Sequence, residues 1–385
     1  MTLPKLKILI APSSFKESMT ATIASEAIGQ GVLEVLPKSR IWKIPLADGG
    51  AGTVDSLLQA MGGTKVYLEV KDPLGRKINA YYGLLSEGKL AVIEMAASSG
   101  LALLSTLERN PMLASSYGCG ELINDALNRG VKKIILGLGD TATVDGGIGL
   151  LQALGVKILD ITGKEVGQGG RALKQIASLD PSQIKQKLAG VEILIASDVN
   201  NPLLGAKGAA EVFARQKGAT EEMVLELELG LSHWAKVLSK TTKLKNELPG
   251  AGAAGGVAIG LVSLLGANIV SGSQLLFDYH KLDKKISCAD LIFTGEGSID
   301  EQTLQGKMPD RLAQMAKQAK VPLIAFAGQI AINSKNLEKR GFYSVIPIVD
   351  KVMTLSDAYK LGPELLKVAT KRTLQMILLG KRIIK

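Results

Sequence analysis

The segment at 134–155 constrains the fold more than any other part of the chain. It contains an apolar run at 134–138, a loop rich in Gly, Asp and Thr, and apolar residues at helical spacing after the loop. An apolar run bounded by turn residues indicates a buried strand, and the later spacing indicates a helix. The segment therefore predicts a strand, a tight loop and a helix start, which is the repeating unit of an α/β fold with a parallel sheet.

The spacing D-G-G-x-G occurs twice, at 48–52 and at 145–149, each time after an apolar segment and before a helical pattern. Glycine lets the backbone turn tightly and lets a ligand come close. The first N–H groups of a helix have no partner inside the helix and suit an anion. The two loops together indicate a site for phosphate or carboxylate, although ordinary turn chemistry explains either loop alone equally well.

The alternation of strands and helices is found at both ends of the chain. It predicts strands at 7–11, 41–45, 291–294, 323–327 and 343–347, and helices at about 23–35, 53–61 and 308–320. In the middle, three strand-like runs at 66–94 are separated by turn signals and predict an antiparallel element. The other middle elements are helices at about 114–128 and 220–239, a strand at 191–196 and a buried helix at 253–270.

The length of 385 residues is large for one hydrophobic core, so two domains are expected. Both ends show the alternation of strands and helices that is typical of a doubly wound sheet, which indicates one domain interrupted by another. We expect the first domain to comprise 1–64 and 285–385, and the inserted α/β domain to comprise 65–284.

Composition argues against several classes of function. The only cysteines, Cys119 and Cys288, provide neither a disulfide framework nor a zinc site of the usual kind, which fits a reducing compartment. The only histidines, His233 and His280, make histidine-based catalysis an unfavoured reading.

The net charge of +10 is compatible with nucleic acid, but the lysines are scattered and form no stripe with aromatic residues. Small anionic substrates explain the excess equally well. The N-terminus has no signal-peptide core, and the longest apolar window is shorter than a comfortable membrane span. We expect a cytoplasmic protein, monomer or homodimer, that binds neither nucleic acid nor a membrane.

The segment at 250–255 matches G-x-G-x-x-G. A dinucleotide fingerprint requires a preceding strand, and 243–248 (K-L-K-N-E-L) is a poor one. We therefore expect these glycines to pack against a neighbouring element or to contact a phosphate.

Polar residues gather directly after the predicted strands, and such positions converge at one edge of a parallel sheet. Lysines, carboxylates, hydroxyls and glycines without histidine or cysteine are the usual set for phosphoryl transfer. That reaction needs Mg²⁺ on oxygen ligands, positive charge at the phosphoryl group and a carboxylate near the acceptor hydroxyl. No Walker A motif is present, because Glu301 stands where its first glycine is required and Met308 follows Lys307. Each polar residue taken singly also fits a capping or solvated position.

The chain resembles the bacterial type I glycerate kinases over nearly its whole length. The resemblance is carried by S-F-K-E-S at 14–18, P-L-A-D-G-G at 45–50, T-A-T-V-D-G-G-I-G at 141–149, S-D-V-N-N-P-L at 197–203, Q-K-G-A-T at 216–220, P-G-A-G-A-A-G-G at 249–256 and T-G-E-G-S-I-D-E-Q-T-L-Q-G-K at 294–307. It implies a Rossmann-like domain with a second α/β domain inserted, and an active site in the cleft between them. It also implies phosphorylation of D-glycerate to 2-phosphoglycerate with ATP and Mg²⁺.

Chemistry and strand-end position give the candidate residues their roles. Lys16 and Lys307 would neutralise phosphate or substrate carboxylate, and Asp198 would orient or deprotonate the acceptor hydroxyl. Glu296 and Asp300 are the candidate Mg²⁺ ligands. The residues expected to contact substrate or nucleotide are Ser14, Asp48, Gly49, Gly50, Thr141, Asp145, Gly146, Gly147, Asn200, Asn201, Gly295, Gly297 and Thr303.

Several positions depart from the family pattern. The family usually has Asp at the position of Ser13, Glu at that of Ala51 and Arg at that of Ser298. Unusual residues also stand at Asp140, Val144 and the pair Asp310–Arg311. Loss of an arginine removes a fork of donors suited to carboxylate or phosphate. Two alternatives therefore stay open: a kinase of another small hydroxy acid, and a non-catalytic homologue that binds a metabolite or nucleotide.

Overall fold

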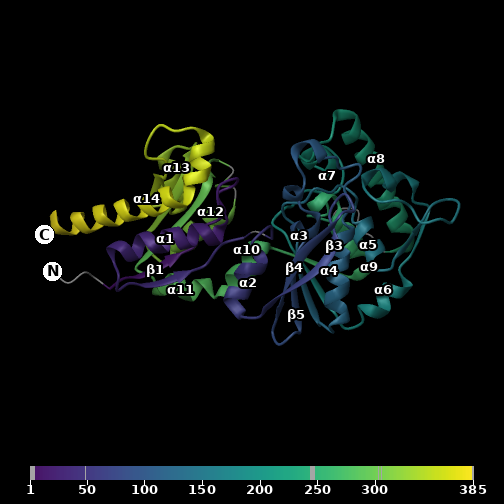
Figure 1. The fold of residues 1–385 in the computed structure, drawn as a ribbon, viewed down its shortest axis with the longest axis horizontal. Helices are drawn as coiled ribbons and strands as arrows, with labels where there is room; N and C mark the ends of the chain where they lie inside the picture. Colours follow the sequence, from purple (N-terminus) through teal and green to yellow (C-terminus); the bar gives the residue numbers. More distant parts are fainter. Residues whose placement is uncertain (1–4, 48, 243–247, 302, 305, 384–385) are drawn as a thin grey trace. The chain divides into compact units, whose positions relative to one another are not determined.

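The computed structural model describes residues 5–47, 49–242, 248–301, 303–304 and 306–383 (Figure 1). The chain divides into a first unit, 1–47 with 276–385, and a second unit, 48–275. Residues 53–61 lie in the second unit because α2 (Thr53–Met61) packs against two strands of that unit, and 282–284 lie in the first because α11 (Leu282–Cys288) packs against its first strand. Both junctions differ in this way from the ranges expected from the sequence.

The first unit contains a five-stranded sheet in which all strands are parallel, as the alternation of elements predicts. Its order is β13-β12-β11-β1-β2, with β1 at Lys7–Ile10, β2 at Arg40–Lys43, β11 at Leu291–Ile299, β12 at Leu323–Ile330 and β13 at Ser344–Pro347. The chain proceeds outward from β1 in one direction and from β11 in the other. The point where the order reverses therefore lies between β1 and β11, and the carboxyl ends of these strands form a crevice that suits a ligand.

Helices α1 (Ala21–Val35) and α14 (Leu355–Ile383) pack along each other in the first unit (Figure 1). The Thr20 hydroxyl caps α1 by accepting a hydrogen bond from Ile23 N, and Ile28 and Val32 are buried at helical spacing. The other helices of this unit are α11, α12 (Met308–Gln318) and α13 (Ser334–Arg340), with α10 (Gly272–His280) crossing the junction.

The second unit contains a mixed six-stranded sheet of order β10-β9-β6-β5-β4-β3. Its strands are β3 (Thr64–Lys71), β4 (Lys77–Leu85), β5 (Leu90–Glu94), β6 (Lys133–Gly137), β9 (Glu192–Ala196) and β10 (Asn268–Val270). The pairs β3–β4 and β4–β5 are antiparallel, which confirms the antiparallel element expected at 66–94, and the remaining pairs are parallel. A short antiparallel pair, β7 (Lys157–Leu159) with β8 (Ser178–Asp180), forms a separate sheet.

Helices cover the mixed sheet and bury an apolar core that includes Leu136, Leu151 and Trp234. They are α2, α3 (Ala96–Ser99), α4 (Tyr117–Asn128), α5 (Ile148–Ala153), α6 (Ser182–Lys187), α7 (Ala209–Phe213), α8 (Glu221–Thr241) and α9 (Val257–Leu265). The buried helix expected at 253–270 is shorter, because Gly266 adopts a left-handed φ of 69° after α9 and the chain then enters β10. None of the helices in the described part of the chain is long and apolar enough to cross a membrane.

Candidate active site

In the first unit, the segment that follows β1 is hydrogen-bonded to the middle of β11. Ser13 N donates to Gly295 O at 2.8 Å, and Thr294 Oγ1 donates to Ala11 O at 2.7 Å. Both bonds lie at the point where the strand order reverses. The segment after β1 that carries Ser14 and Lys16, both exposed, is therefore held beside the second half of β11.

Gly295 and Gly297 allow this close approach. A Cβ at residue 295 would lie 2.6 Å from Phe326 O, and a Cβ at residue 297 would lie 3.3 Å from Lys16 N. Larger side chains at these two positions would push apart the neighbouring strand and the turn that carries Lys16. Close backbone packing thus accounts for both glycines without a ligand.

A carboxylate and a threonine form the centre of the first-unit cluster. Thr303 Oγ1 donates to Glu296 Oε1 at 2.6 Å, and Thr303 N donates to Asp300 Oδ1 at 3.0 Å. Burial raises the pKa of Glu296; the Thr303 hydrogen bond and the nearby charges of Lys307 and Lys16 oppose this, and the charge of Asp300 adds to it. These five predicted residues of the first unit therefore act on one another electrostatically or through hydrogen bonds.

The loop that carries Thr303 and Lys307 is anchored by an ion pair between a buried carboxylate and a half-buried guanidinium, which the sequence did not reveal. Asp310 is completely buried, and its Oδ1 accepts from Arg340 Nε at 2.7 Å. Arg340 Nη2 also donates to Leu304 O at 2.6 Å. One guanidinium thus joins α12, α13 and the loop, and the unusual residue at position 310 has a structural explanation.

In the second unit, the loop after β6 is held from within by Asp145. The carboxylate is completely buried and accepts from Ser116 N at 2.8 Å, Ser116 Oγ at 2.7 Å and Gly147 N at 3.1 Å. Burial raises the pKa of Asp145, and these hydrogen bonds oppose the rise. Gly146 N donates to Gly255 O. The N–H groups expected to bind an anion at Gly146 and Gly147 are therefore engaged inside the protein.

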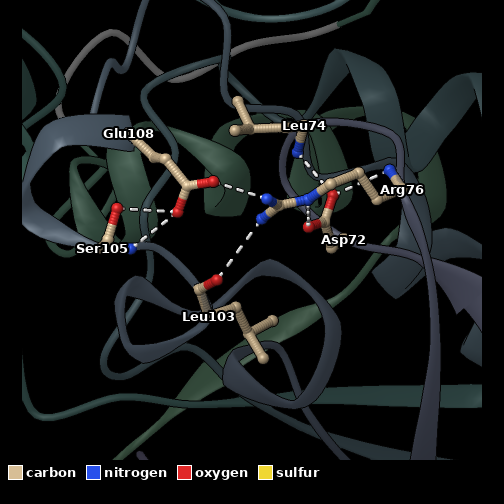
Figure 2. Close-up of polar contacts among 6 residues, drawn as sticks. All are labelled: Asp72, Leu74, Arg76, Leu103, Ser105 and Glu108. Carbon is tan, nitrogen blue, oxygen red and sulfur yellow. Dashed lines mark hydrogen bonds and ion pairs between the residues drawn. The ribbon is translucent and has the colours of Figure 1, made fainter.

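A polar network fixes the segment that precedes Ser116 (Figure 2). The buried carboxylate of Asp72 accepts from Leu74 N at 2.8 Å and from Arg76 N at 2.9 Å, and it forms an ion pair with the Arg76 guanidinium. Arg76 also contacts Glu108, which accepts from Ser105 N and Oγ, both at 2.9 Å. Pro73 O in the same turn accepts from Ser115 N. The turn between β3 and β4 thus supports the residues that hold Asp145.

A carboxylate of the protein also accepts hydrogen bonds from N–H groups at the first D-G-G-x-G loop and the start of α2. Asp48 lies outside the described residues. Glu94, at the end of β5, accepts from Val54 N at 2.7 Å, and Gly52 N is a second donor to it. Burial raises the pKa of Glu94 to about 7, against the effect of these two bonds. The start of α2 is thus occupied by Glu94, which the sequence reasoning missed although it stands at a strand end.

Glycines let the two loops approach each other. Gly139 N donates to Gly49 O at 3.0 Å, and a Cβ at residue 139 would collide with Gly50 Cα. Asp140 adopts a left-handed φ of 59°, and its Oδ2 accepts from Ala51 N at 3.2 Å. Two positions that depart from the family pattern, 51 and 140, are therefore in direct contact.

Asp198 follows β9 and is exposed, with both of its oxygens held. Ser271 Oγ donates to Asp198 Oδ1 at 2.6 Å, and Ser273 N donates to Asp198 Oδ2 at 3.0 Å. Asn201 Nδ2 donates to Lys207 O at 2.9 Å, whereas Asn200 is exposed. The Ser271 and Ser273 bonds fix the direction in which the Asp198 carboxylate faces.

The glycine-rich segment at 250–256 has a packing role. A Cβ at residue 252 would collide with Pro202 O, and a Cβ at residue 255 would collide with Thr143 O. Gly252 N donates to Asn201 O at 3.0 Å. The segment thus joins the loop after β9 to the loop after β6, and packing alone accounts for these glycines.

The predicted residues fall into two sets. Lys16, Gly295, Glu296, Gly297, Asp300, Thr303 and Lys307 belong to the first unit with Ser14, and Gly49, Gly50, Thr141, Asp145, Gly146, Gly147, Asp198, Asn200 and Asn201 belong to the second. Besides Glu94 and Arg340, the sequence reasoning missed the buried Lys217, whose Nζ donates to the loop after β6. Its only signal was its place in the Q-K-G-A-T segment, which the resemblance includes without a role.

Comparison with known proteins agrees with this architecture. The glycerate kinase family matches residues 8–378. The glycerate kinase of Halalkalibacterium halodurans is 43% identical over 365 residues, which cover 94% of this chain and 96% of that protein. The glycerate 2-kinase of Escherichia coli K12 is 41% identical over 356 residues, with 92% and 93% covered. A crystal structure from Salmonella typhimurium LT2, described as glycerate kinase 2, superposes with a TM-score of 0.83 at 40% identity and covers 98% of this chain and 100% of that one. The chain belongs to the glycerate kinase family.

Proposed function

We propose that the protein phosphorylates D-glycerate with ATP and releases 2-phosphoglycerate and ADP. The observation that carries the proposal is the similarity, over nearly the whole chain, to proteins described as glycerate kinases. The cluster at the ends of β1 and β11 supports it, because two lysines and two carboxylates near a strand-order reversal suit a phosphorylated ligand. Both cysteines are free thiols, which is compatible with the cytoplasmic setting that we propose.

In this reaction the acceptor hydroxyl oxygen attacks the γ-phosphorus, and the bond to the β,γ-bridging oxygen breaks. Lys16 and Lys307 neutralise negative charge on phosphate or on the substrate carboxylate. Asp198 orients the acceptor hydroxyl and takes its proton, and the Ser271 and Ser273 hydrogen bonds hold the carboxylate in one direction.

Glu296 and Asp300 are proposed to hold Mg²⁺. In the described part of the chain, no group of three or more His, Cys, Asp or Glu side chains is placed to hold a metal ion. One or two carboxylates suffice for Mg²⁺ in a kinase, because water and substrate phosphates complete its shell. The donor set therefore fits this ion, which supplies neutralisation of the phosphate charge when bound.

A coupled assay of ADP formation tests the proposal, with D-glycerate and a panel of other small hydroxy acids. We expect turnover with D-glycerate and loss of at least tenfold in kcat/KM for Lys307→Met. Lys284→Met, an exposed lysine of the same unit, is the matched control and should retain wild-type kinetics. Turnover with another hydroxy acid alone would show that this acid, and not D-glycerate, is the substrate. Binding without turnover would favour a non-catalytic homologue.

A further inference from the structure

Lys217 is a buried cation that the proposed reaction has not used. It ends the short 3₁₀ helix at Arg215–Lys217, and only 4% of it is exposed. Gly218 follows with a left-handed φ of 93°, and a Cβ there would collide with Arg109 O. The backbone around Lys217 is thus fixed, and its side chain extends into the interior of the second unit.

The ammonium of Lys217 has two partners, both on the loop after β6. Nζ donates to Thr143 O at 2.8 Å and to Thr141 Oγ1 at 3.1 Å. Burial lowers the pKa of Lys217 to about 7, and the nearby charge of Asp145 opposes this effect by favouring the protonated amine. Burial of an ammonium disfavours folding unless partners compensate it, and an apolar side chain of similar length would avoid that cost. A role beyond packing therefore explains the lysine better.

The direction of the Lys217–Thr141 bond has a chemical consequence. In its protonated form Lys217 can only donate, so the Thr141 oxygen then accepts this hydrogen bond. The Thr141 hydroxyl proton is then directed away from Lys217 and can donate to another oxygen. A hydroxyl fixed as a donor suits an anionic acceptor such as a phosphate or carboxylate oxygen.

The backbone of the same loop is held independently of Lys217. Ala142 N donates to Ser99 O at 2.9 Å, and Asp140 O accepts from Leu101 N at 2.8 Å. Loss of the Lys217 ammonium should therefore change the orientation of the Thr141 hydroxyl more than the course of the chain.

We propose that Lys217 is a positioning residue for phosphoryl transfer, which orients the Thr141 hydroxyl as a donor to an anionic oxygen of nucleotide or substrate. The inference rests on the proposed function, since it takes Thr141 as a ligand contact. It adds a residue whose ammonium donates both of its hydrogen bonds to the loop after β6.

A double-mutant cycle on the full-length protein tests this role. kcat and KM for ATP and for D-glycerate are measured for Lys217→Met, Thr141→Val and the double variant, with Thr141→Ser and Lys236→Met as controls. We expect each single variant to lose about tenfold or more in kcat/KM for the same ligand, because a hydrogen bond that orients a donor to a charged group is lost. The double variant should lose no more than the larger single loss.

The controls separate orientation from packing. Thr141→Ser keeps the hydroxyl and should stay within about threefold of wild type, and Lys236→Met, at an exposed lysine of α8, should match wild type. Kinetics of Lys217→Met within twofold of wild type, or losses that multiply in the double variant, would overturn the inference. If Lys217→Met does not fold, equal kinetics of Thr141→Val and Thr141→Ser overturn it.

Calorimetric titration of the same proteins with Mg-ATP and with D-glycerate distinguishes the two proposals. A wild type that binds but does not turn over contradicts the proposed function, and weaker binding by Lys217→Met and Thr141→Val would still support the role of Lys217. A wild type that binds neither ligand contradicts both.

Discussion

At the scale of single residues, Glu94 shows how the fold changes the chemistry of a side chain. The carboxylate is 6% exposed and accepts from two N–H groups at the start of α2, yet burial outweighs these bonds and raises its pKa to about 7. Between the unfolded pKa near 4.5 and the folded value, the native protein binds a proton that the unfolded chain lacks. The contribution of Glu94 to stability is therefore present below about pH 4.5 and is lost as pH rises through about 7.

Glu94→Gln should remove this dependence. A neutral amide does not titrate, so the free energy of unfolding of the variant relative to wild type should rise between pH 4.5 and pH 8, by an amount on the order of 3 kcal/mol. Urea denaturation at a series of pH values measures the difference. Parallel stability profiles of the two proteins would contradict the assignment.

Asp145 has a structural role in the loop after β6, and its removal should be costly. Asp145→Ala leaves Ser116 and the N–H groups of Gly147 and Gly149 without their acceptor in a buried site. We expect a loss of about 2–4 kcal/mol in the free energy of unfolding. Asp283→Ala, at an exposed position of α11, is the control and should lose less than about 1 kcal/mol. Equal losses in the two variants would contradict the role of Asp145.

At the scale of elements, the ion pair of Asp310 with Arg340 joins α12 to α13, and Arg340 also donates to Leu304 O in the loop before α12. Arg340→Leu leaves a completely buried carboxylate without its cationic partner, so we expect a loss of about 3–5 kcal/mol in stability. Asp310→Leu combined with Arg340→Leu removes the unpaired charge and should recover at least half of that loss. Thermal and urea unfolding compare the three proteins, and a double variant less stable than Arg340→Leu would contradict this account.

The strands and the longer helices could be predicted from the sequence because their apolar periodicity is strong. The strands β1, β6 and β9 were expected to within two residues of their ends. The short strand β10 was missed, because three residues inside an apolar window do not distinguish a strand from a helix. The 29-residue helix α14 was not predicted, although Leu366 and Leu374 in it are buried.

The partners of the candidate residues could not be predicted in the same way. The two D-G-G-x-G loops look alike in sequence, but different carboxylates accept their hydrogen bonds. Asp145 accepts from N–H groups of its own loop, whereas Glu94, on a different strand, accepts from N–H groups at the other. Glu94, Lys217 and Arg340 act through contacts with residues distant in the chain. Sequence periodicity predicts which face of an element is buried, but it does not identify such partners.

At the scale of the whole molecule, the candidate residues are distributed over two units, each with its own sheet and core. A ligand that binds the native protein and not the unfolded chain raises its stability by mass action, by about 2.7 kcal/mol at one hundred times its dissociation constant. Mg-ATP together with D-glycerate should therefore raise the unfolding temperature in differential scanning calorimetry. Lys307→Met should reduce the increase and Lys284→Met should not. An unfolding temperature unaffected by either ligand would contradict binding.

The most direct test of the central claim is ³¹P NMR of wild-type protein incubated with ATP, Mg²⁺ and D-glycerate. Phosphoryl transfer predicts a phosphomonoester resonance of 2-phosphoglycerate that grows in step with ADP, with a turnover number on the order of 1–100 s⁻¹. A spectrum that shows only ATP, or only ADP with inorganic phosphate, would contradict the account.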